Sequence, residues 1–224
     1  KPAFFARFKL LSKIDVSGAR LLTLPATMVT CVGLQELNVD SNALTTLPDL
    51  RACSRLRVIS CANCRLTALP AWIGECTTLV EFVASSNRIA SPLPSLVECR
   101  SLRTLDLRRN VIRSLPRLPP GLSRLLASDN NLDEISTVTG CVDLCELNLQ
   151  RNKVVTLPDD LADLHQLEII NVCQNLLQSV DVPGMARRVP KLRELKISSN
   201  PLGAVPWWLA DVPKGAMEEA FVQE

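Results

Sequence analysis

One pattern of leucines returns along most of the chain, and this repetition constrains the fold more than any other feature. A representative unit reads Leu102-Arg-Thr-Leu105-Asp-Leu107-Arg-Arg-Asn110-Val-Ile112. Successive units open 20 to 25 residues apart, too regularly for unrelated segments. The sequence therefore predicts nine structural repeats that stack on one another. The repeats open at Leu11, Leu34, Leu56, Leu79, Leu102, Leu122, Leu144, Leu167 and Leu192.

Each repeat combines a short strand with a longer returning segment. The opening part alternates leucines with variable residues, which is typical of a strand with one buried face. Because every repeat runs in the same direction, the strands are expected to form a parallel sheet. At ~4.8 Å per strand, eight steps give a sheet roughly 38 Å long. The returning segments carry Leu-Pro pairs such as Leu47-Pro48 and Leu157-Pro158, which favour turns and short helical pieces.

An asparagine recurs at one position shortly after each predicted strand. There the chain turns inward, and its backbone groups lose their partners in the sheet. A buried amide side chain offers both a donor and an acceptor to replace those partners. Ala19 and Cys64 occupy the position in the first and third repeats, so those links are expected to be weaker. The asparagines are Asn42, Asn87, Asn110, Asn130, Asn152, Asn175 and Asn200.

The pattern Leu-x-x-Leu-x-Leu-x-x-Asn-x-Leu resembles the signature of the leucine-rich repeat family over about residues 11–206. The trailing Leu-Pro resembles the typical intracellular subclass, which includes Ras-suppressor-like scaffold proteins. The 20-residue unit that opens at Leu102 resembles the compact repeats of bacterial effector proteins. The family resemblance implies an α/β fold, a right-handed solenoid bent into a horseshoe arc. A parallel sheet would line the concave side, with short helices or turns on the convex side.

Both ends of such a stack need covers, because a terminal repeat leaves an apolar face open. We expect residues 1–10 to form an N-terminal cap, residues 11–206 the nine repeats, and residues 207–224 a C-terminal cap. The sequence begins with Lys1 and not with Met, so it can be a processed chain or part of a longer one. The apolar residues expected to cover the two ends are Phe4, Phe5, Phe8, Leu10, Trp207, Trp208, Leu209 and Val212.

Charge and composition argue against several classes of function. Basic and acidic residues nearly balance, 25 against 23, which gives no whole-chain field for nucleic acid or membrane. No stretch approaches the ~20 uninterrupted apolar residues of a membrane-spanning helix. The single histidine, His165, and the lack of a Gly-rich phosphate loop argue against catalysis. We therefore expect neither an enzyme nor a cofactor.

The cysteines look functional until they are placed in the repeat. Five of them share one repeat position that Leu164 and Val189 hold later, which indicates a core site. Cys61 and Cys64 have zinc-like spacing, but no second pair follows, so no metal is expected. The odd count of nine and the absence of Asn-x-Ser/Thr favour a reducing cytoplasmic location. The five core cysteines are Cys31, Cys53, Cys76, Cys99 and Cys141, and the two expected on the open strand surface are Cys145 and Cys173.

The third, fifth and seventh residues of each unit are expected to point to the concave face, because strand side chains alternate. Glu36 and Asp40 would make its first part acidic, Val58 and Val83 would form an apolar strip, and Arg108 with Arg124 would form a central basic zone. Leu126 and Ile169 would be exposed apolar anchors. Arginine beside apolar residues is typical of interface hot spots. The candidate partner-binding residues are Glu36, Asp40, Val58, Val83, Asp106, Arg108, Arg124, Leu126, Asn148, Gln150, Ile169 and Asn171.

These features favour a non-catalytic protein–protein interaction module, a scaffold or adaptor that holds a protein partner on its concave face and is monomeric in isolation. One alternative is a structural subunit of a large cytoskeletal or ribonucleoprotein assembly. Another is the substrate-recognition domain of a larger enzyme. The central arginines raise the question of RNA, but the strand positions lack aromatic residues for base stacking, which argues against nucleic acid.

Overall fold

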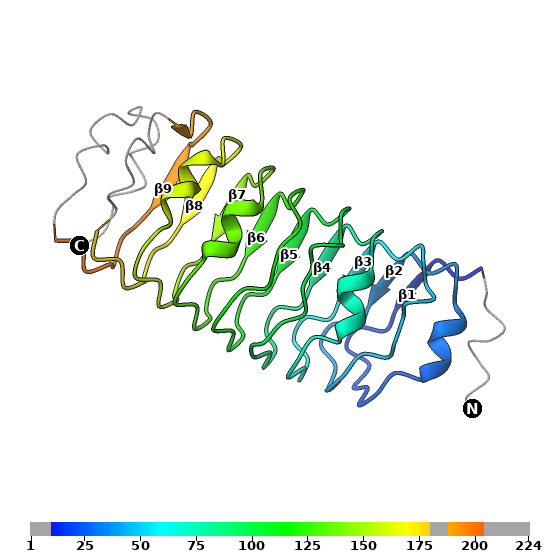
Figure 1. The fold of residues 1–224 in the computed structure, drawn as a ribbon. Coiled ribbons are helices and arrows are strands. Elements are labelled where there is room, and N and C mark those ends of the chain that lie inside the picture. The colour runs from blue at the N-terminus through cyan, green and yellow to red at the C-terminus, as the bar shows by residue number, and fades with distance from the viewer. Residues whose placement is uncertain (1–9, 180–187, 204–224) are drawn as a thin grey trace.

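The computed structural model describes residues 10–179 and 188–203. Nine strands form one open parallel sheet in the order β1 to β9, so each strand lies beside its neighbour in the chain (Figure 1). This confirms the predicted solenoid with a parallel sheet. The strands are β1 (Lys13–Asp15), β2 (Glu36–Asn38), β3 (Val58–Ser60), β4 (Glu81–Val83), β5 (Thr104–Asp106), β6 (Arg124–Leu126), β7 (Glu146–Asn148), β8 (Ile169–Asn171) and β9 (Glu194–Lys196).

The register of the sheet keeps equivalent residues of neighbouring repeats side by side. Leu105 in β5 lies opposite Phe82 in β4 and Leu125 in β6. All three are fully buried, because the middle residue of each strand points into the stack. The first and last residues of each strand point the other way. They form a surface that we call the strand face.

Within the described residues, the returning segments contain short 3-10 helices. In Figure 1 these helices lie on the opposite side of the stack from the strands. A 3-10 turn is narrower than an α-helix, so the two sides of each coil differ little in width. The stack of coils therefore bends only slightly. The helices are η2 (Ala26–Thr30), η3 (Ala71–Glu75), η4 (Ser136–Gly140) and η5 (Asp159–Asp163).

The repeated asparagines join each coil to the one before it. The Asn110 side chain donates to the carbonyl oxygens of Ala84, at 3.0 Å, and Leu107, at 3.0 Å. Its Oδ1 accepts the backbone N–H of Ile89 at 2.9 Å. The same arrangement recurs at Asn42, Asn87, Asn130, Asn152, Asn175 and Asn200.

The third repeat keeps part of this link without an asparagine. The Cys64 thiol donates to the carbonyl oxygen of Val39 at 3.4 Å. A thiol has one S–H, which is a weaker donor than an amide N–H, and it has no second donor. We therefore expect this junction to be less stable than its neighbours.

The residue before each asparagine position has a left-handed backbone. Its φ is 52° to 57° in eight repeats and 65° at Gly18 in the first. Only one of these nine residues is glycine, although such φ values are uncommon for other residue types. Bonds from the flanking coils therefore hold a turn that the residue itself does not favour. The non-glycine residues are Ser41, Asn63, Ser86, Arg109, Asp129, Arg151, Gln174 and Ser199.

The nine cysteines all lie within the described residues, where none forms a disulfide and most are buried. Burial raises the pKa of Cys53 and Cys99 to about 11, and that of Cys76 and Cys141 to about 12. The expected position of Cys173 on the open strand surface is wrong, because that side chain is buried and accepts a hydrogen bond from the Ser198 hydroxyl at 3.1 Å. Cys145 is half-buried, and its thiol donates to the carbonyl oxygen of Asp143.

The residues proposed as caps lie almost wholly outside the described residues. Leu10, the one cap residue within them, is exposed. Within residues 10–179 and 188–203, no helix has the length and apolarity needed to cross a membrane.

Replacing Asn110 with alanine is expected to lower the free energy of unfolding by about 1–3 kcal/mol, because it leaves the buried Ile89 N–H and two carbonyl groups without their partner. Urea unfolding, monitored by circular dichroism, measures this change in the free energy of unfolding. Asn131→Ala is the matched control, since no hydrogen bond of that side chain occurs in the described residues, and it should change the value by less than about 0.5 kcal/mol. Equal losses would show that the link between coils is not what Asn110 contributes.

The buried thiols are expected to make stability fall in alkaline solution. Their folded pKa lies above the value of about 8.5 in the unfolded chain, so the stabilisation is complete below that pH and is lost as the pH rises toward the folded pKa. Each thiol contributes a loss of up to about 1.4 kcal/mol per pH unit. In Cys141→Val, the free energy of unfolding, measured with urea between about pH 8.5 and 10.5, should fall less steeply with pH than in the wild type. An unchanged decline would rule out Cys141 as a contributor.

Candidate functional site

The register brings all twelve predicted partner-binding residues to the strand face or its margin. Nine of them occupy the first or last position of a strand, and the other three follow a strand by two residues. The three are Asp40, Arg108 and Gln150. The nine are Glu36, Val58, Val83, Asp106, Arg124, Leu126, Asn148, Ile169 and Asn171.

The two acidic residues predicted for the first part of the strand face both have partners. Glu36 forms an ion pair with Lys13 of the neighbouring strand at 2.8 Å. Asp40 accepts the Ser60 hydroxyl at 2.7 Å and the backbone N–H of Ala62 at 2.6 Å. Both carboxylates are therefore engaged with neighbouring coils.

The central basic zone consists of arginines that hold carboxylate partners. Arg108 binds Asp106 in a two-pronged arrangement, with Nε–Oδ1 at 3.0 Å and Nη2–Oδ2 at 2.7 Å. The Asp106 side chain is only 5% exposed while that of Arg108 is 46% exposed. The Asp106 carboxylate is therefore the buried counter-ion of Arg108, and Arg108 is the more exposed member of the pair. Arg124 pairs with Glu146 of the next strand at 2.7 Å.

Leu126 is not the exposed apolar anchor that was expected. It is 8% exposed even though it lies on the strand face, outside the main core. Its register partners are Asp106 and Asn148, and side chains on parallel strands only ~4.8 Å apart cover each other's flanks. The other predicted apolar residues, Val58, Val83 and Ile169, remain partly exposed.

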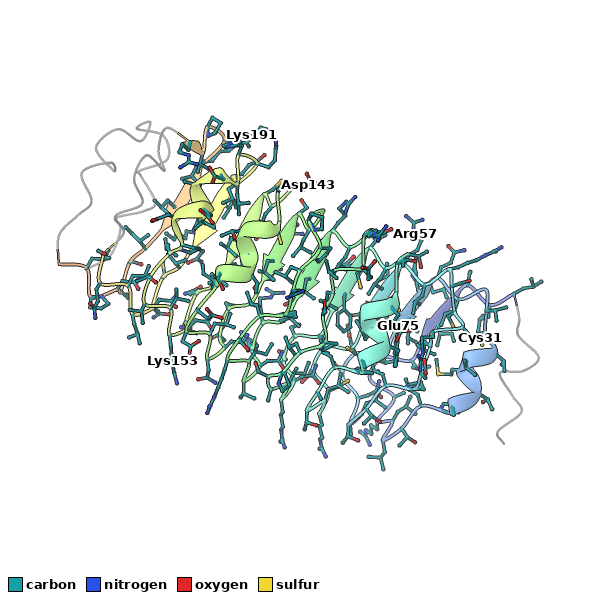
Figure 2. All side chains as sticks on the ribbon, viewed as in Figure 1. Cys31, Arg57, Glu75, Asp143, Lys153 and Lys191 are labelled. Carbon is teal, nitrogen blue, oxygen red and sulfur yellow. The ribbon has the colours of Figure 1, made fainter. Side chains whose placement is uncertain are left out.

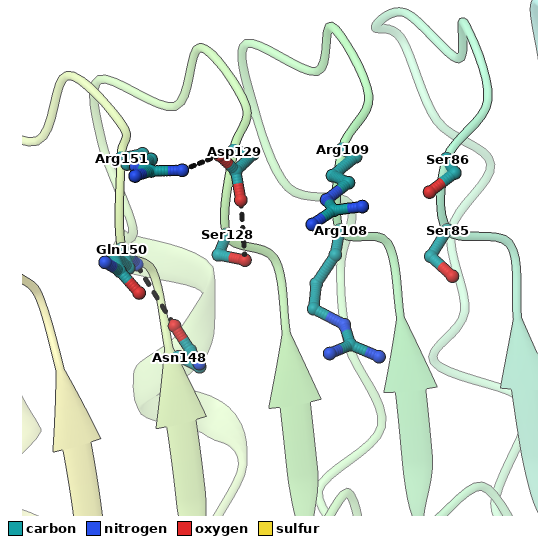
Figure 3. Close-up of a pocket in the computed structure, with 9 residues that line it drawn as sticks. All are labelled: Ser85, Ser86, Arg108, Arg109, Ser128, Asp129, Asn148, Gln150 and Arg151. Atoms are coloured by element: carbon teal, nitrogen blue, oxygen red, sulfur yellow. Dashed lines mark hydrogen bonds and ion pairs between the residues drawn. The ribbon is translucent and has the colours of Figure 1, made fainter.

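A hollow of about 430 Å³ lies where strands β4 to β7 end (Figure 3). We call it the strand-end hollow. Three of the predicted residues meet there, while the others lie along the rest of the strand face. Hydroxyl, amide and guanidinium groups dominate its lining. The lining residues are Ser85, Ser86, Arg108, Arg109, Ser128, Asp129, Asn148, Gln150 and Arg151.

The predicted set omitted most of this lining. The omitted residues include Ser86, Arg109, Asp129 and Arg151, which all have the left-handed backbone described above. In an alternating strand these residues would not face the same side as Arg108. The left-handed turn interrupts the alternation, so the position before each asparagine was the signal that could have found them.

Hydrogen bonds fix part of the hollow. The Arg151 Nη1 lies 3.3 Å from Asp129 Oδ1, and its Nε donates to Gln174 at 2.7 Å. The Ser128 hydroxyl donates to Asp129 at 3.3 Å, as Figure 3 shows. Arg109 forms no ion pair in the part of the chain that the structure describes. The arrangement can bind polar or anionic groups of a partner, and no group of three metal-ligating side chains occurs among the described residues.

The Arg108–Asp106 pair is expected to stabilise the fold more than the Arg124–Glu146 pair. Arg108→Gln leaves the buried Asp106 carboxylate without its counter-ion, which should lower the free energy of unfolding by about 1–3 kcal/mol. Arg124→Gln should cost less than about 1 kcal/mol, because Glu146 is more accessible to water. Urea unfolding compares the two, and an equal cost would contradict the difference in burial.

Two leucine-rich repeat family models match the chain, over residues 143–202 and 98–114. A probable serine/threonine-protein kinase of Dictyostelium discoideum, pats1, is 31% identical over 175 residues, which cover 70% of this chain and 6% of that protein. The ectodomain of the plant receptor kinase GASSHO1/SCHENGEN3 from Arabidopsis thaliana is 27% identical with a TM-score of 0.80, covering 93% of this chain and 26% of that one.

YopM from Yersinia enterocolitica shares 30% identity with a TM-score of 0.63, over 86% of this chain and 37% of that chain. The chain therefore corresponds to a small part of the kinase and of the receptor, and to little more than a third of YopM. What the two solved structures share with this chain is the fold. The residue pattern, the matching family models and the nine parallel coils together identify the chain as a leucine-rich repeat protein.

Proposed function

We propose that the protein is a non-catalytic scaffold or adaptor that binds a partner protein on its strand face. The observation that carries this proposal is the composition of that face between β3 and β8. It combines the partly exposed Val58, Val83 and Ile169 with the amide groups of Asn148 and Asn171. Apolar contacts surrounded by hydrogen-bonding groups are typical of protein interfaces.

The size of the face also supports the proposal. The strand face and its margin, the position two residues past each strand, offer three outward positions in each of nine repeats, about as many residues as one side of a standard interface, roughly 20–30. Several are fixed in place by neighbours, as Glu36 is by Lys13 and Arg124 by Glu146. A surface whose side chains are already ordered loses less entropy when it binds. Leucine-rich repeat proteins are generally interaction modules, and the Arabidopsis receptor ectodomain was solved in complex with CASPARIAN STRIP INTEGRITY FACTOR 2.

A second candidate is the substrate-recognition part of a larger enzyme. The observation that favours it is the match to 6% of a probable protein kinase of Dictyostelium discoideum. In that case the strand face would bind the enzyme's substrate, and the chemistry would belong to another domain. Sequencing the full transcript distinguishes this candidate from a free-standing adaptor.

A reducing, cytoplasmic location is part of the proposal. It is supported by the nine cysteines, which form no disulfide within the described residues that contain them all. Disulfides persist mainly in oxidising compartments. Localisation of a tagged full-length protein by microscopy tests this, and secretion into the medium would contradict it.

The strand face is tested by a charge variant with a matched control. Val58→Arg with Val83→Arg is expected to weaken capture of the partner by at least about tenfold, since each buried charge in an interface costs a large part of the binding energy. Val97→Arg with Val142→Arg introduces the same charges at exposed valines away from the strand face and should leave capture unchanged.

The measurement is quantitative pull-down from the source cells, with bound proteins identified by mass spectrometry. Circular dichroism first confirms that both variants fold. If the strand-face variant captures the same protein as strongly as the wild type does, the binding surface lies elsewhere and the proposal fails.

A further inference from the structure

The turns that follow strands β3, β4 and β5 carry charges of one sign only. Residues 62–68, 85–91 and 108–114 contain no Asp or Glu. They contain five arginines, one of which, Arg108, is bound to Asp106. The other four are all exposed, and we call them the strand-end row. They are Arg65, Arg88, Arg109 and Arg113.

The strand-end row differs from most other arginines in having no carboxylate partner. Arg51, Arg100 and Arg124 each form an ion pair. No ion pair of Arg65, Arg88, Arg109 or Arg113 occurs within residues 10–179 and 188–203. In a chain with a net charge of only +2, this edge therefore holds a local positive field that the molecule itself does not neutralise.

The row follows the stacking direction over the third, fourth and fifth coils, and it ends at the turn after β6, where Asp129, Asp133 and Glu134 lie. Arg65, Arg88 and Lys153 occupy the same position, directly after the asparagine position of their coils, and Arg20 takes it in the first coil. Figure 2 shows Lys153 at one edge of the stack, with Arg57 and Asp143 at the opposite edge. From the third to the fifth coil the distance is roughly 10 Å, at ~4.8 Å per step, which an extended segment of about three residues spans at ~3.3 Å per residue.

We propose that the strand-end row binds an acidic, extended segment of a partner protein. Charge complementarity selects an anionic ligand, and the row is as long as a short extended segment. The adjoining strand-end hollow adds the Ser85 hydroxyl and the Asn148 amide, which suit a peptide backbone. This site lies at the edge of the sheet and is separate from the apolar contacts proposed for the strand face.

The chemistry of this edge fits a peptide better than a nucleic acid. Proteins that bind single strands combine a basic groove with aromatic rings on which the bases stack. The aromatic residues within the described part of the chain are Trp72 and Phe82, and both are buried. The row can therefore attract phosphate groups, but neither of these rings is available for a base to stack on, and the exposed His165 follows η5, not the ends of strands β3 to β5.

The opposite edge of the sheet supplies a matched control. Arg55 and Arg57 are exposed and form no ion pair among the described residues. They belong to one repeat, however, and do not form a row. Farther along that edge, Arg100 pairs with Glu98 and Arg193 with Glu168.

The test uses a fluorescein-labelled peptide of about ten residues, in which glutamate alternates with serine, and the full chain at about 0.05 M salt. Fluorescence anisotropy gives the dissociation constant. Arg88→Glu with Arg109→Glu is expected to weaken binding by at least about tenfold, because attraction becomes repulsion. Arg55→Glu with Arg57→Glu changes the net charge equally and should weaken binding by less than about twofold. Arg88→Gln with Arg109→Gln should give an intermediate loss, and thermal melting checks that each variant is folded.

Three results would overturn the proposal. The peptide could fail to bind, or both double variants could weaken binding equally, which would indicate diffuse attraction. A single-stranded RNA of about ten nucleotides, or vesicles with anionic lipid, could bind more tightly than the peptide through the same arginines. The variant Val58→Arg with Val83→Arg should still bind the peptide. The result for the strand-end row is therefore independent of the result for the strand face.

Discussion

The bonds between successive coils are the interaction on which the rest of the structure depends. A single coil has a three-residue strand and a few buried side chains, too little to fold alone. Asn110 shows how coils are joined, because one amide satisfies groups on both its own coil and the previous one. The repeated bond fixes the spacing of the coils. It thereby fixes which side chains stand next to each other on every surface.

That spacing explains the properties of the strand face. Side chains at equivalent positions lie one strand apart, so Lys13 meets Glu36 and Arg124 meets Glu146. The turns that follow the strands adopt a left-handed backbone and direct a further set of residues to the edge. The face and the edge therefore carry different chemistry, with apolar groups, amides and paired charges on the face and arginines without a carboxylate partner on the edge. Two partner segments could use them at the same time.

The sequence predicted the position of each strand and the side to which its residues point, because leucine spacing determines both. Burial on the strand face was harder to predict. Asp106 and Leu126 point outward as expected, yet Arg108 and the neighbouring strands cover them. Side-chain alternation gives the direction of a residue, while its exposure depends on the size and charge of the residues beside it. The Lys13–Glu36 and Arg124–Glu146 pairs, by contrast, join the same position of adjacent repeats, so a column-by-column comparison of the repeats is enough to predict them.

Amide hydrogen exchange measured by nuclear magnetic resonance tests most directly whether the asparagine bonds hold the coils together. We expect the backbone N–H groups of Ile89 and Ile112, which donate to Asn110 and Asn130, to exchange only by global unfolding. The equivalent N–H of Leu44, which faces Cys64 in place of an asparagine, should exchange faster. If Ile89 and Ile112 exchange as fast as amides in exposed turns, the asparagine bonds do not carry the stability of the stack.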